Sequence, residues 1–472
     1  MASDAAPVLF WFGRDLRLGR NAALSAACAA GPVIPVFILD DEGVDRPLGG
    51  ASRWWLHHSL AALAKNLEAH GARLILRRGR SCDVLAALAQ ETGARRVVAH
   101  RRYEPDAAAM QAEARRMLAR SDAELDIVHE TGRVAPEDLL TQQGRPYQVF
   151  GAFDRALKAR EAPAERIADP TFSPPPSWPA SEALSAWGLR PVSPDWASQF
   201  GEVWTPGEAG AQARLHRFLD EALQDYPENR DRPDRDGTSG LSPHLRWGEI
   251  APDDVLAAAR FRRHLEPGLE AQVAKLETEL NWRAFGAYLL FHDPDLGRKA
   301  ARPAYDKIRW RNDPVGFRAW SRGRTGVPIV DAGMRQLWRT GFMHNRVRMI
   351  VASFLVKNLL IDWRRGEAWF WDTLVDADPA SNAMNWQWAA GSGVDAAPYF
   401  RVFNPVTQGE RFDPDGVYVR RWVPELARAP AQAIHAPWTL PSGPPDGYPA
   451  PIVDLRETRL RALDAYRQAL SA

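Results

Sequence analysis

Apolar runs and amphipathic stretches alternate over the first 130 residues. The runs VLFWF, VIPVFIL, RLILR, RRVVAH and LDIVH predict strands, and the stretches near 21–30, 52–70, 82–92 and 106–120 have helical spacing. Repeated β-α units predict a doubly wound parallel sheet, which usually binds a ligand at the carboxyl ends of its strands. The first turn, FGRDLRLGRN, lacks GxGxxG, and this absence argues against an ordinary nicotinamide dehydrogenase.

The pattern changes near residue 160. The segments DPTFSPPPSWP and RPVSPDW are too rich in proline for long helices and predict a connector. Beyond residue 211 nearly every segment has helical period, including AQARLHRFLDEALQDY, LEAQVAKLETELNWRAFGAYLLF and GFMHNRVRMIVASFLVKNLL. We therefore predict a Rossmann-like α/β domain over residues 1–135, a connector over 136–210 and an all-α domain over 211–472.

The charge balance is close to neutral, with 60 Lys and Arg against 59 Asp and Glu, so any surface for nucleic acid must be local. Two cysteines without metal-ligand spacing, an N-terminus without signal-peptide features and no apolar run of membrane-spanning length predict a cytosolic protein. Tryptophan is abundant, with 19 residues. Large aromatic side chains can simply fill a helical core; as a group they also suggest stacking surfaces or electron transfer.

The segment DGTSGLSPHLRWGEI predicts a turn followed by a helix start, with Ser242 as N-cap and Pro243 at the first helical position. The hydroxyls of Thr238, Ser239 and Ser242, together with free helix amides, suit a pyrophosphate. A plain capped helix explains the same residues.

In ELNWRAF, Glu279 and Arg283 are four residues apart and can form a surface ion pair. Trp282 lies on the same side of the predicted helix as Glu279. A carboxylate acceptor and an indole face could therefore bind a planar base together.

Further polar residues follow in two segments. In GFMHNRVRM the side chains of Asn345, Arg348 and Met349 share one helical stripe, whereas Arg346 points elsewhere. In DADPASNAMNWQWAAGSG the carboxylates of Asp376 and Asp378 are candidate helix caps and Asn382 a turn former; Trp386 and Trp388 face nearly opposite sides of a helix. HExxH, Walker A, GxSxG and EF-hand patterns are absent from the sequence, so it contains no recognisable machinery for hydrolysis or phosphoryl transfer.

Eight segments in order along residues 7–440 resemble the DNA photolyase/cryptochrome family, most closely its cyclobutane pyrimidine dimer photolyases. They are FWFGRDLRL, YQVFGAFDRAL, DGTSGLSPHLRWGEI, ELNWRAF, GVPIVDAGMRQL, GFMHNRVRMIVASFLVKNLLIDWRRGE, DADPASNAMNWQWAAGSGVDAAPYFRVFNPVTQGERFD and YVRRWVPEL. The resemblance implies an α/β antenna domain and a helical domain that binds FAD. It implies light-driven repair, in which excited reduced FAD lends an electron to a pyrimidine dimer swung out of the DNA duplex.

The resemblance also implies roles for individual residues. Those expected to contact FAD are Tyr226, Thr238, Ser239, Gly240, Leu241, Ser242, Glu279, Arg283, Asn345, Arg348, Asp376, Asp378 and Asn382. Arg348 is expected to pair with Asp376, and Asn382 to face flavin N5. Glu279, Met349 and Asn382 are the expected catalytic residues.

Electron transfer and DNA binding are assigned in the same way. Trp386, Trp363 and Trp310 resemble an electron relay that reduces the flavin in light, with Trp369 and Trp371 as a possible side branch. Residues expected at the lesion or the surrounding DNA phosphates are Arg230, Trp282, Asn345, Arg346, Trp388 and Arg401. The implied protein is a monomer without a metal ion.

Three alternatives stay open. Plant-type cryptochromes, which are blue-light receptors, have aspartate at the position of Asn382 and a long C-terminal extension. The (6-4) photolyases use histidines in the lesion pocket, where this chain has Asn345 and Met349. The identity of the antenna chromophore is open because Asp106 and Ala107 depart from the pattern of folate-binding members. Methenyltetrahydrofolate is the first preference, and a deazaflavin or an empty site is the second.

Overall fold

The computed structural model describes residues 6–42, 44, 46–129, 134–160 and 167–471. Its N-terminal part contains a five-stranded parallel sheet of order β3-β2-β1-β4-β5. Strands are added on one side of β1 up to β3 and then on its other side, so the strand order reverses between β1 and β4. The strands are β1 (Val8–Phe12), β2 (Val33–Leu39), β3 (Ile75–Arg78), β4 (Arg96–His100) and β5 (Glu124–Val128). The predicted doubly wound sheet is confirmed, with β3 shifted by one to two residues from the apolar run that predicted it.

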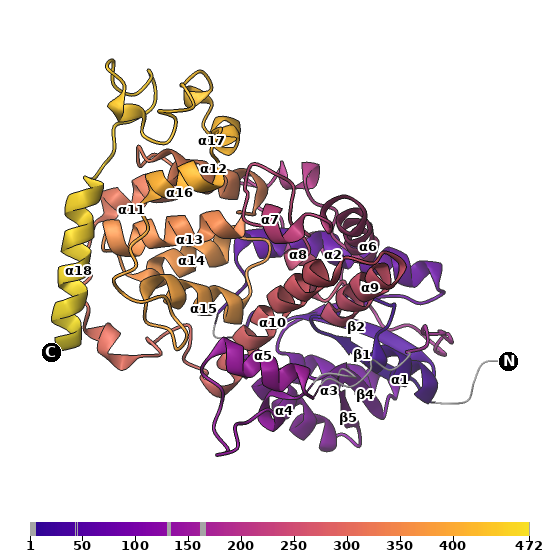
Figure 1. Cartoon of the computed structure of the whole chain (residues 1–472). Helices are drawn as coiled ribbons and strands as arrows, with labels where there is room; N and C mark the ends of the chain where they lie inside the picture. The colour runs from indigo at the N-terminus through magenta and orange to yellow at the C-terminus, as the bar shows by residue number, and fades with distance from the viewer. Residues whose placement is uncertain (1–5, 43, 45, 130–133, 161–166, 472) are drawn as a thin grey trace.

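Helices cover both faces of this sheet (Figure 1). They are α1 (Ala22–Ala30), α2 (Gly50–Ala69), α3 (Ser81–Thr92) and α4 (Pro105–Ala119). Phe10 and Phe12 of β1 belong to the core beneath α1 and α2, whereas Leu9 and Trp11 belong to the core beneath α3 and α4. A strand covered on both faces is apolar throughout, which explains why β1 is a continuous hydrophobic run.

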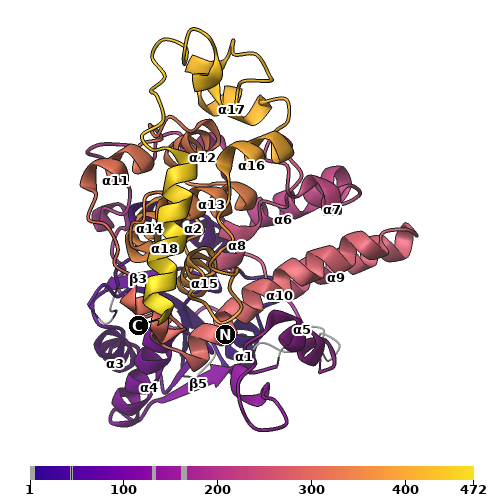
Figure 2. The same ribbon diagram turned by 60° about the vertical axis from the view of Figure 1, so that its left-hand side comes forward.

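The second half of the chain is helical, and Figure 2 shows α9 and α10 extending away from α18. Its helices are α6 (Glu208–Arg217), α7 (Tyr226–Asn229), α8 (Ser242–Trp247), α9 (Pro252–Leu265), α10 (Glu270–His292), α11 (Pro314–Ser321), α12 (Pro328–Thr340), α13 (Asn345–Ser353), α14 (Trp363–Thr373), α15 (Pro379–Ala390), α16 (Pro405–Phe412), α17 (Val417–Trp422) and α18 (Leu455–Ser471). The described part of the predicted connector contains α5 (Phe150–Lys158), whose Phe153 packs on Phe285 of α10 at a centroid distance of 5.0 Å. Among the described residues, no helix is long and apolar enough to span a bilayer.

The helix predicted over 341–360 begins only at Asn345. Gly341 ends α12 in the left-handed conformation, with φ of 65°, and an added Cβ would lie 2.7 Å from Phe200 and Val375. Only glycine satisfies both constraints. Beyond α13 the chain continues as a π-helical turn, Phe354–Asn358.

That π-helical turn buries Lys357 in the largest core region, which α12 to α15 surround. Its Nζ donates to the carbonyls of Ala390 and Tyr399 at 3.0 and 3.2 Å and lies 3.7 Å from the ring centroid of Tyr466. Burial lowers the pKa of Lys357 from its usual 10.5 to about 7. The fold therefore holds a lysine that is costly to protonate.

The Lys357→Met variant tests this cost through the pH dependence of folding. Because the pKa of Lys357 is lower in the folded state, the wild type loses stability as the pH falls from 10.5 to about 7 and loses no more below that. The free energy of unfolding of the variant, relative to that of the wild type, should therefore rise by several kcal/mol as the pH falls through this range. Denaturant titrations from pH 10.5 to 6 measure it, with exposed Lys158→Met as the control; a parallel pair of curves would contradict the expectation.

Candidate functional site

A cavity of about 550 Å³ opens in the helical half, within the usual range for small-molecule sites. Most of the predicted site residues line it: Tyr226, Arg230, Thr238, Ser239, Gly240, Leu241, Ser242, Glu279, Trp282, Arg283, Asn345, Arg346, Arg348, Met349, Asp376, Asp378, Asn382, Trp386 and Trp388. Trp310, Trp363 and Arg401 do not line it. Segments as far apart in the sequence as Tyr226 and Trp388 thus contribute to one cavity.

The hydroxyl-rich loop before α8 forms part of the wall. Gly240 takes the left-handed conformation with φ of 61°. Ser242 is the first residue of α8, and its hydroxyl donates to Oδ2 of Asp376 at 2.6 Å instead of capping the helix. The predicted N-cap role of Ser242 is therefore wrong, because a buried carboxylate from a distant segment takes up the hydroxyl.

Asp376 is a buried acceptor centre of the cavity. Its Oδ2 accepts from Ser242 and from Nη2 of Arg348 at 2.8 Å, the expected ion pair. Its Oδ1 is buried and has no partner among the described residues. Buried carboxylate oxygens are normally hydrogen-bonded, so this atom calls for a donor from a ligand in the cavity.

Asp378 is the N-cap of α15, as predicted, and accepts from the amides of Ala380 and Ser381. Burial alone would raise the pKa of Asp378, but the guanidinium groups of Arg246, Arg283 and Arg14 hold it below its usual value. Asp378 therefore stays ionised at the base of the cavity.

The possible ion pair between Glu279 and Arg283 is not formed. Glu279 pairs with Arg230 at 2.7 Å and with Lys275 at 2.8 Å, while Nη2 of Arg283 donates to the carbonyl of Leu245 at 3.1 Å. Each side chain instead contacts a residue outside this pair. Glu279 is therefore held by two cations at the cavity wall.

Two tryptophans form flat apolar walls. Trp282 stacks on Phe150 of α5 with centroids 3.7 Å apart and planes 8° apart, so one ring face is covered. Trp388 lies 6.3 Å from Phe403, and the guanidinium of Arg401 lies 6.0 Å from its ring. Arg401 thus lies next to a residue of the cavity wall, Trp388, without lining the cavity itself.

The stripe predicted for α13 is correct for Asn345, Arg348 and Met349, which all line the cavity. Arg346 lines it as well, contrary to the expectation that it points elsewhere. It forms an ion pair with Asp231, and its Nη1 lies 3.8 Å from Sδ of Met349. The ion pair with Asp231 and the contact with Met349 hold the long side chain at the cavity.

Asn382 lies within α15, so the turn interpretation is wrong. Its Nδ2 donates to Oε1 of Glu367 at 2.7 Å and to the Glu367 carbonyl at 3.0 Å. Of the two terminal amide atoms, this leaves the acceptor Oδ1 to contact a ligand in the cavity. Glu367 is a site residue that the sequence did not reveal.

The three relay candidates share one core region. Trp386 and Trp363 are 2% and 1% exposed, and half-buried Trp310 packs against the same region. The rings nearest Trp386 are Phe370 at 5.0 Å and Trp320 at 6.2 Å. Trp320, which the sequence did not single out, therefore extends the aromatic cluster.

A second aromatic series continues from Trp320 toward the surface. Phe317 follows at 5.7 Å, Trp369 at 6.3 Å from Phe317, and Trp338 at 6.1 Å from Trp369. Trp338 is 44% exposed. Trp371 lies apart, with Nε1 bonded to the carbonyl of Pro47. The side branch through Trp369 thus has continuous ring neighbours.

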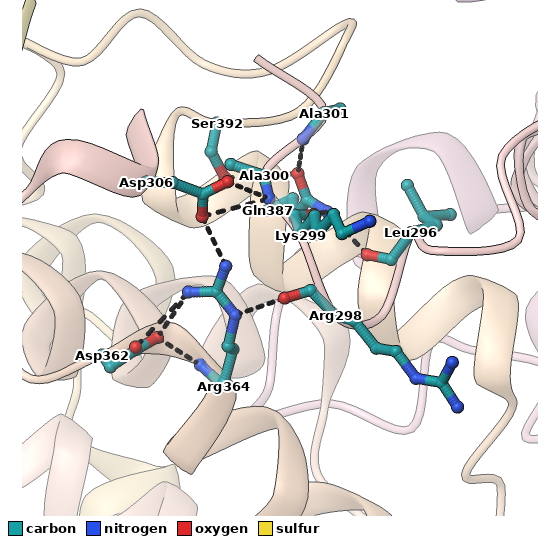
Figure 3. Close-up of polar contacts among 10 residues, drawn as sticks. All are labelled: Leu296, Arg298, Lys299, Ala300, Ala301, Asp306, Asp362, Arg364, Gln387 and Ser392. Carbon is teal, nitrogen blue, oxygen red and sulfur yellow. Dashed lines mark hydrogen bonds and ion pairs between the residues drawn. The ribbon is translucent and has the colours of Figure 1, made fainter. Parts of the chain in front are cut away.

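Polar contacts fix the helices that carry these indoles (Figure 3). Between Trp386 and Trp388, the fully buried Gln387 donates to the carbonyls of Leu296 and Lys299 at 2.6 and 2.8 Å. Next to Trp363, Arg364 pairs with Asp306 at 2.5 Å. Both networks tie α14 and α15 to the segment before α11.

The comparisons with known proteins agree with this geometry. The family described as DNA photolyase matches residues 8–175, and the FAD binding domain of DNA photolyase matches residues 276–468. The deoxyribodipyrimidine photo-lyase of Agrobacterium fabrum is 51% identical over 99% of this chain and 98% of its own. The chain belongs to the DNA photolyase family.

Two further likenesses bear on the branch of this family. A crystal structure of a bacterial class III photolyase from Agrobacterium tumefaciens superposes with a TM-score of 0.95 at 48% identity, covering 100% of this chain and 99% of that one. Cryptochrome-1 of Arabidopsis thaliana is 35% identical over 98% of this chain and 70% of its own length. Proteins named photolyases and proteins named cryptochromes are thus both among the relatives of this chain.

The residues present fit FAD. The cavity combines a hydroxyl loop with left-handed Gly240, the unpartnered Oδ1 of Asp376 and the outward Oδ1 of Asn382. Hydroxyls suit the phosphates, a buried acceptor suits a ring or ribose donor, and an amide oxygen suits a ring nitrogen that carries hydrogen.

Proposed function

We propose that this protein repairs cyclobutane pyrimidine dimers in DNA in a light-dependent reaction. The observation that carries the proposal is the single 550 Å³ cavity, which joins the FAD-binding residues to two aromatic walls and an ion-paired glutamate. Bound reduced FAD supplies a light-driven electron to the lesion. The chain itself binds and orients the lesion and excludes water from it.

Within this proposal the walls of the cavity hold the lesion. Trp282, backed by Phe150, and Trp388 present ring faces to the fused bases, and Met349 fills the pocket between polar groups. Glu279 accepts a hydrogen bond from a base because Arg230 and Lys275 hold its carboxylate in place. Asn345 and the catalytic Asn382 complete the polar lining.

Arginines at the rim contact the DNA phosphates in this proposal. Arg230, Arg346 and Arg401 stand around the cavity, which gives salt-dependent affinity with little sequence preference. A damaged pair unstacks more readily than an intact one, which favours its entry into the cavity.

Repair of defined oligonucleotides tests the function. The FAD-loaded, reduced protein should restore thymines from a cyclobutane dimer under near-ultraviolet light and not in the dark, as measured by chromatography of the products. Repair of only the (6-4) product would identify the other repair class. No repair of either lesion, with a light-dependent change of oligomeric state, would identify a receptor.

The Trp388→Ala variant should bind dimer-containing DNA roughly 5- to 150-fold more weakly, since stacking on an aromatic ring contributes about 1–3 kcal/mol per base. Its affinity for undamaged DNA should not change, because phosphate contacts dominate there. Fluorescence anisotropy with both DNAs measures this, and Trp338→Ala, an exposed indole outside the cavity, is the control. Equal weakening on both DNAs would remove Trp388 from the lesion site.

An antenna chromophore is also part of the proposal, in the domain over residues 1–135. A cavity of about 210 Å³ lies where the strand order reverses, at the ends of β1 and β4. Arg14 and Arg102 of this domain line it, together with Arg246 of the helical half. Its cationic lining suits the anionic end of methenyltetrahydrofolate or a deazaflavin. An absorption spectrum identifies any second pigment, and light scattering tests the proposed monomer.

A further inference from the structure

Arg46 lies outside the main cavity, between β2 and α2, and contacts a buried carboxylate of the helical half. Its Nη1 donates to Oε1 of Glu367 at 2.8 Å. The Glu367 side chain is 5% exposed, whereas that of Arg46 is 38% exposed. The same Oε1 accepts from Nδ2 of Asn382 at 2.7 Å. One oxygen atom therefore links a partly exposed arginine of the N-terminal half to the cavity wall.

The backbone around Arg46 is docked on α14. The guanidinium of Arg46 lies 4.4 Å from the ring centroid of Trp371, whose Nε1 donates to the carbonyl of Pro47 at 2.9 Å. The amide of Gly50 donates to Oδ1 of Asp372 at 2.8 Å. These contacts fix the position from which Arg46 reaches Glu367.

The partners of Asn382 define the direction of its amide. Both atoms of Glu367 that it contacts, a carbonyl and a carboxylate oxygen, are acceptors, so Nδ2 must face them. Oδ1 then lies on the opposite side, and it has no partner among the described residues. Oε1 of Glu367 accepts from both Arg46 and Asn382, so the position of this carboxylate helps to fix the direction of the amide.

We propose that Arg46 is a positioning residue that holds the Glu367 carboxylate in place and thereby locks Asn382 with its oxygen toward the cavity. The proposal rests on the proposed function in taking the ligand opposite Asn382 to be the flavin ring. An acceptor oxygen favours a ring nitrogen that carries hydrogen, which is the reduced state. The N-terminal half of the chain thus tunes the cofactor of the helical half.

Loss of Arg46 should lower the midpoint potential of bound FAD. Without its cation the Glu367 carboxylate leaves an unbalanced negative charge near the ring, and it can move away from Asn382, which lets the amide turn its donor to the ring. Both outcomes disfavour the reduced ring.

Spectroelectrochemical titration of the FAD-loaded full chain tests this. Arg46→Met should shift the potential to more negative values, and Arg46→Lys, which keeps a cation, should recover part of the shift. Arg77→Met, which breaks an arginine–glutamate pair on the sheet domain, should leave the potential unchanged. A wild-type potential in Arg46→Met would overturn the proposal.

The Glu367→Gln background separates positioning from a direct charge effect. If Arg46 acts through Glu367, adding Arg46→Met to Glu367→Gln should cause no further shift. An equal shift in both backgrounds would mean that Arg46 acts on the ring directly. Should Arg46→Met fail to fold, rescue by Glu367→Gln would support the link, and failure of the double variant would contradict it.

The potential is independent of dimer repair. If the potential shifts in Arg46→Met but the wild type repairs no dimers, the role of Arg46 stands and the proposed function fails. If the wild type repairs dimers but the potential does not shift, the proposed function stands and the role of Arg46 fails.

Discussion

Replacing Trp386 with phenylalanine is expected to abolish light-driven reduction of oxidised FAD while leaving dimer repair by chemically reduced protein close to wild type. Trp386 is the one relay candidate that lines the cavity, and it is 2% exposed. Phenylalanine keeps most of the packing but is far harder to oxidise. Absorbance of the flavin under blue light with an external reductant measures the first effect, and repair after dithionite treatment measures the second.

The outer tryptophans provide the internal comparison. The family resemblance implies one route from Trp386 through Trp363 to half-buried Trp310, which share one core region. Neighbouring rings suggest another, from Trp386 through Trp320, Phe317 and Trp369 to Trp338. Trp310→Phe and Trp369→Phe should therefore each reduce the rate in part, and the double variant should approach Trp386→Phe. If Trp310→Phe/Trp369→Phe photoreduces FAD at the wild-type rate, electrons reach Trp386 by neither of these routes. Loss of repair in prereduced Trp386→Phe would show that Trp386 acts on the lesion.

The architecture could be predicted because its determinants are local. Strands covered on both faces are continuous apolar runs, so VLFWF and VIPVFIL were recognisable as β1 and β2. Asp378 was recognisable as a cap because Pro379 follows it at the first helical position. Helical geometry alone predicted that Trp386 and Trp388 have different neighbours: Trp386 packs against Phe370 and Trp388 against Phe403.

The partners of polar side chains could not be predicted, because they come from distant segments. Glu279 pairs with Arg230 rather than with Arg283, which is nearer in the sequence. The hydroxyl of Ser242 donates to Asp376 rather than capping its own helix. No periodicity encodes such pairs. Family resemblance supplied most members of the cavity but, apart from the Arg348–Asp376 pair, not their hydrogen bonds.

Some residues carried no signal in the sequence. Arg46 and Glu367 are 321 positions apart, and each alone is an ordinary charged residue. Arg246 lies inside a recognised segment, yet only the structure shows that its Nη1 and Nη2 are buried without partners among the described residues. Burial lowers the pKa of Arg246 to about 9, a cost that depends entirely on tertiary packing.

The Asp376→Asn variant should bind FAD roughly 10- to 150-fold more weakly, since a hydrogen bond to a charged group contributes about 1.5–3 kcal/mol. Asparagine keeps the shape of the side chain but cannot accept through both of its terminal atoms. It also leaves the guanidinium of Arg348 without the carboxylate that neutralises it. Titration of the apoprotein with FAD, followed by flavin fluorescence, measures the affinity.

Asp464→Asn, which changes an exposed carboxylate of α18, is the matched control and should bind FAD as the wild type does. An unchanged affinity in Asp376→Asn would mean that its Oδ1 faces water rather than a ligand donor. A fall in thermal stability of the apoprotein with unchanged affinity would assign Asp376 to the fold alone. Because Oδ2 is already saturated by Ser242 and Arg348, weaker binding in a stable apoprotein can come only from the remaining oxygen or from the lost charge.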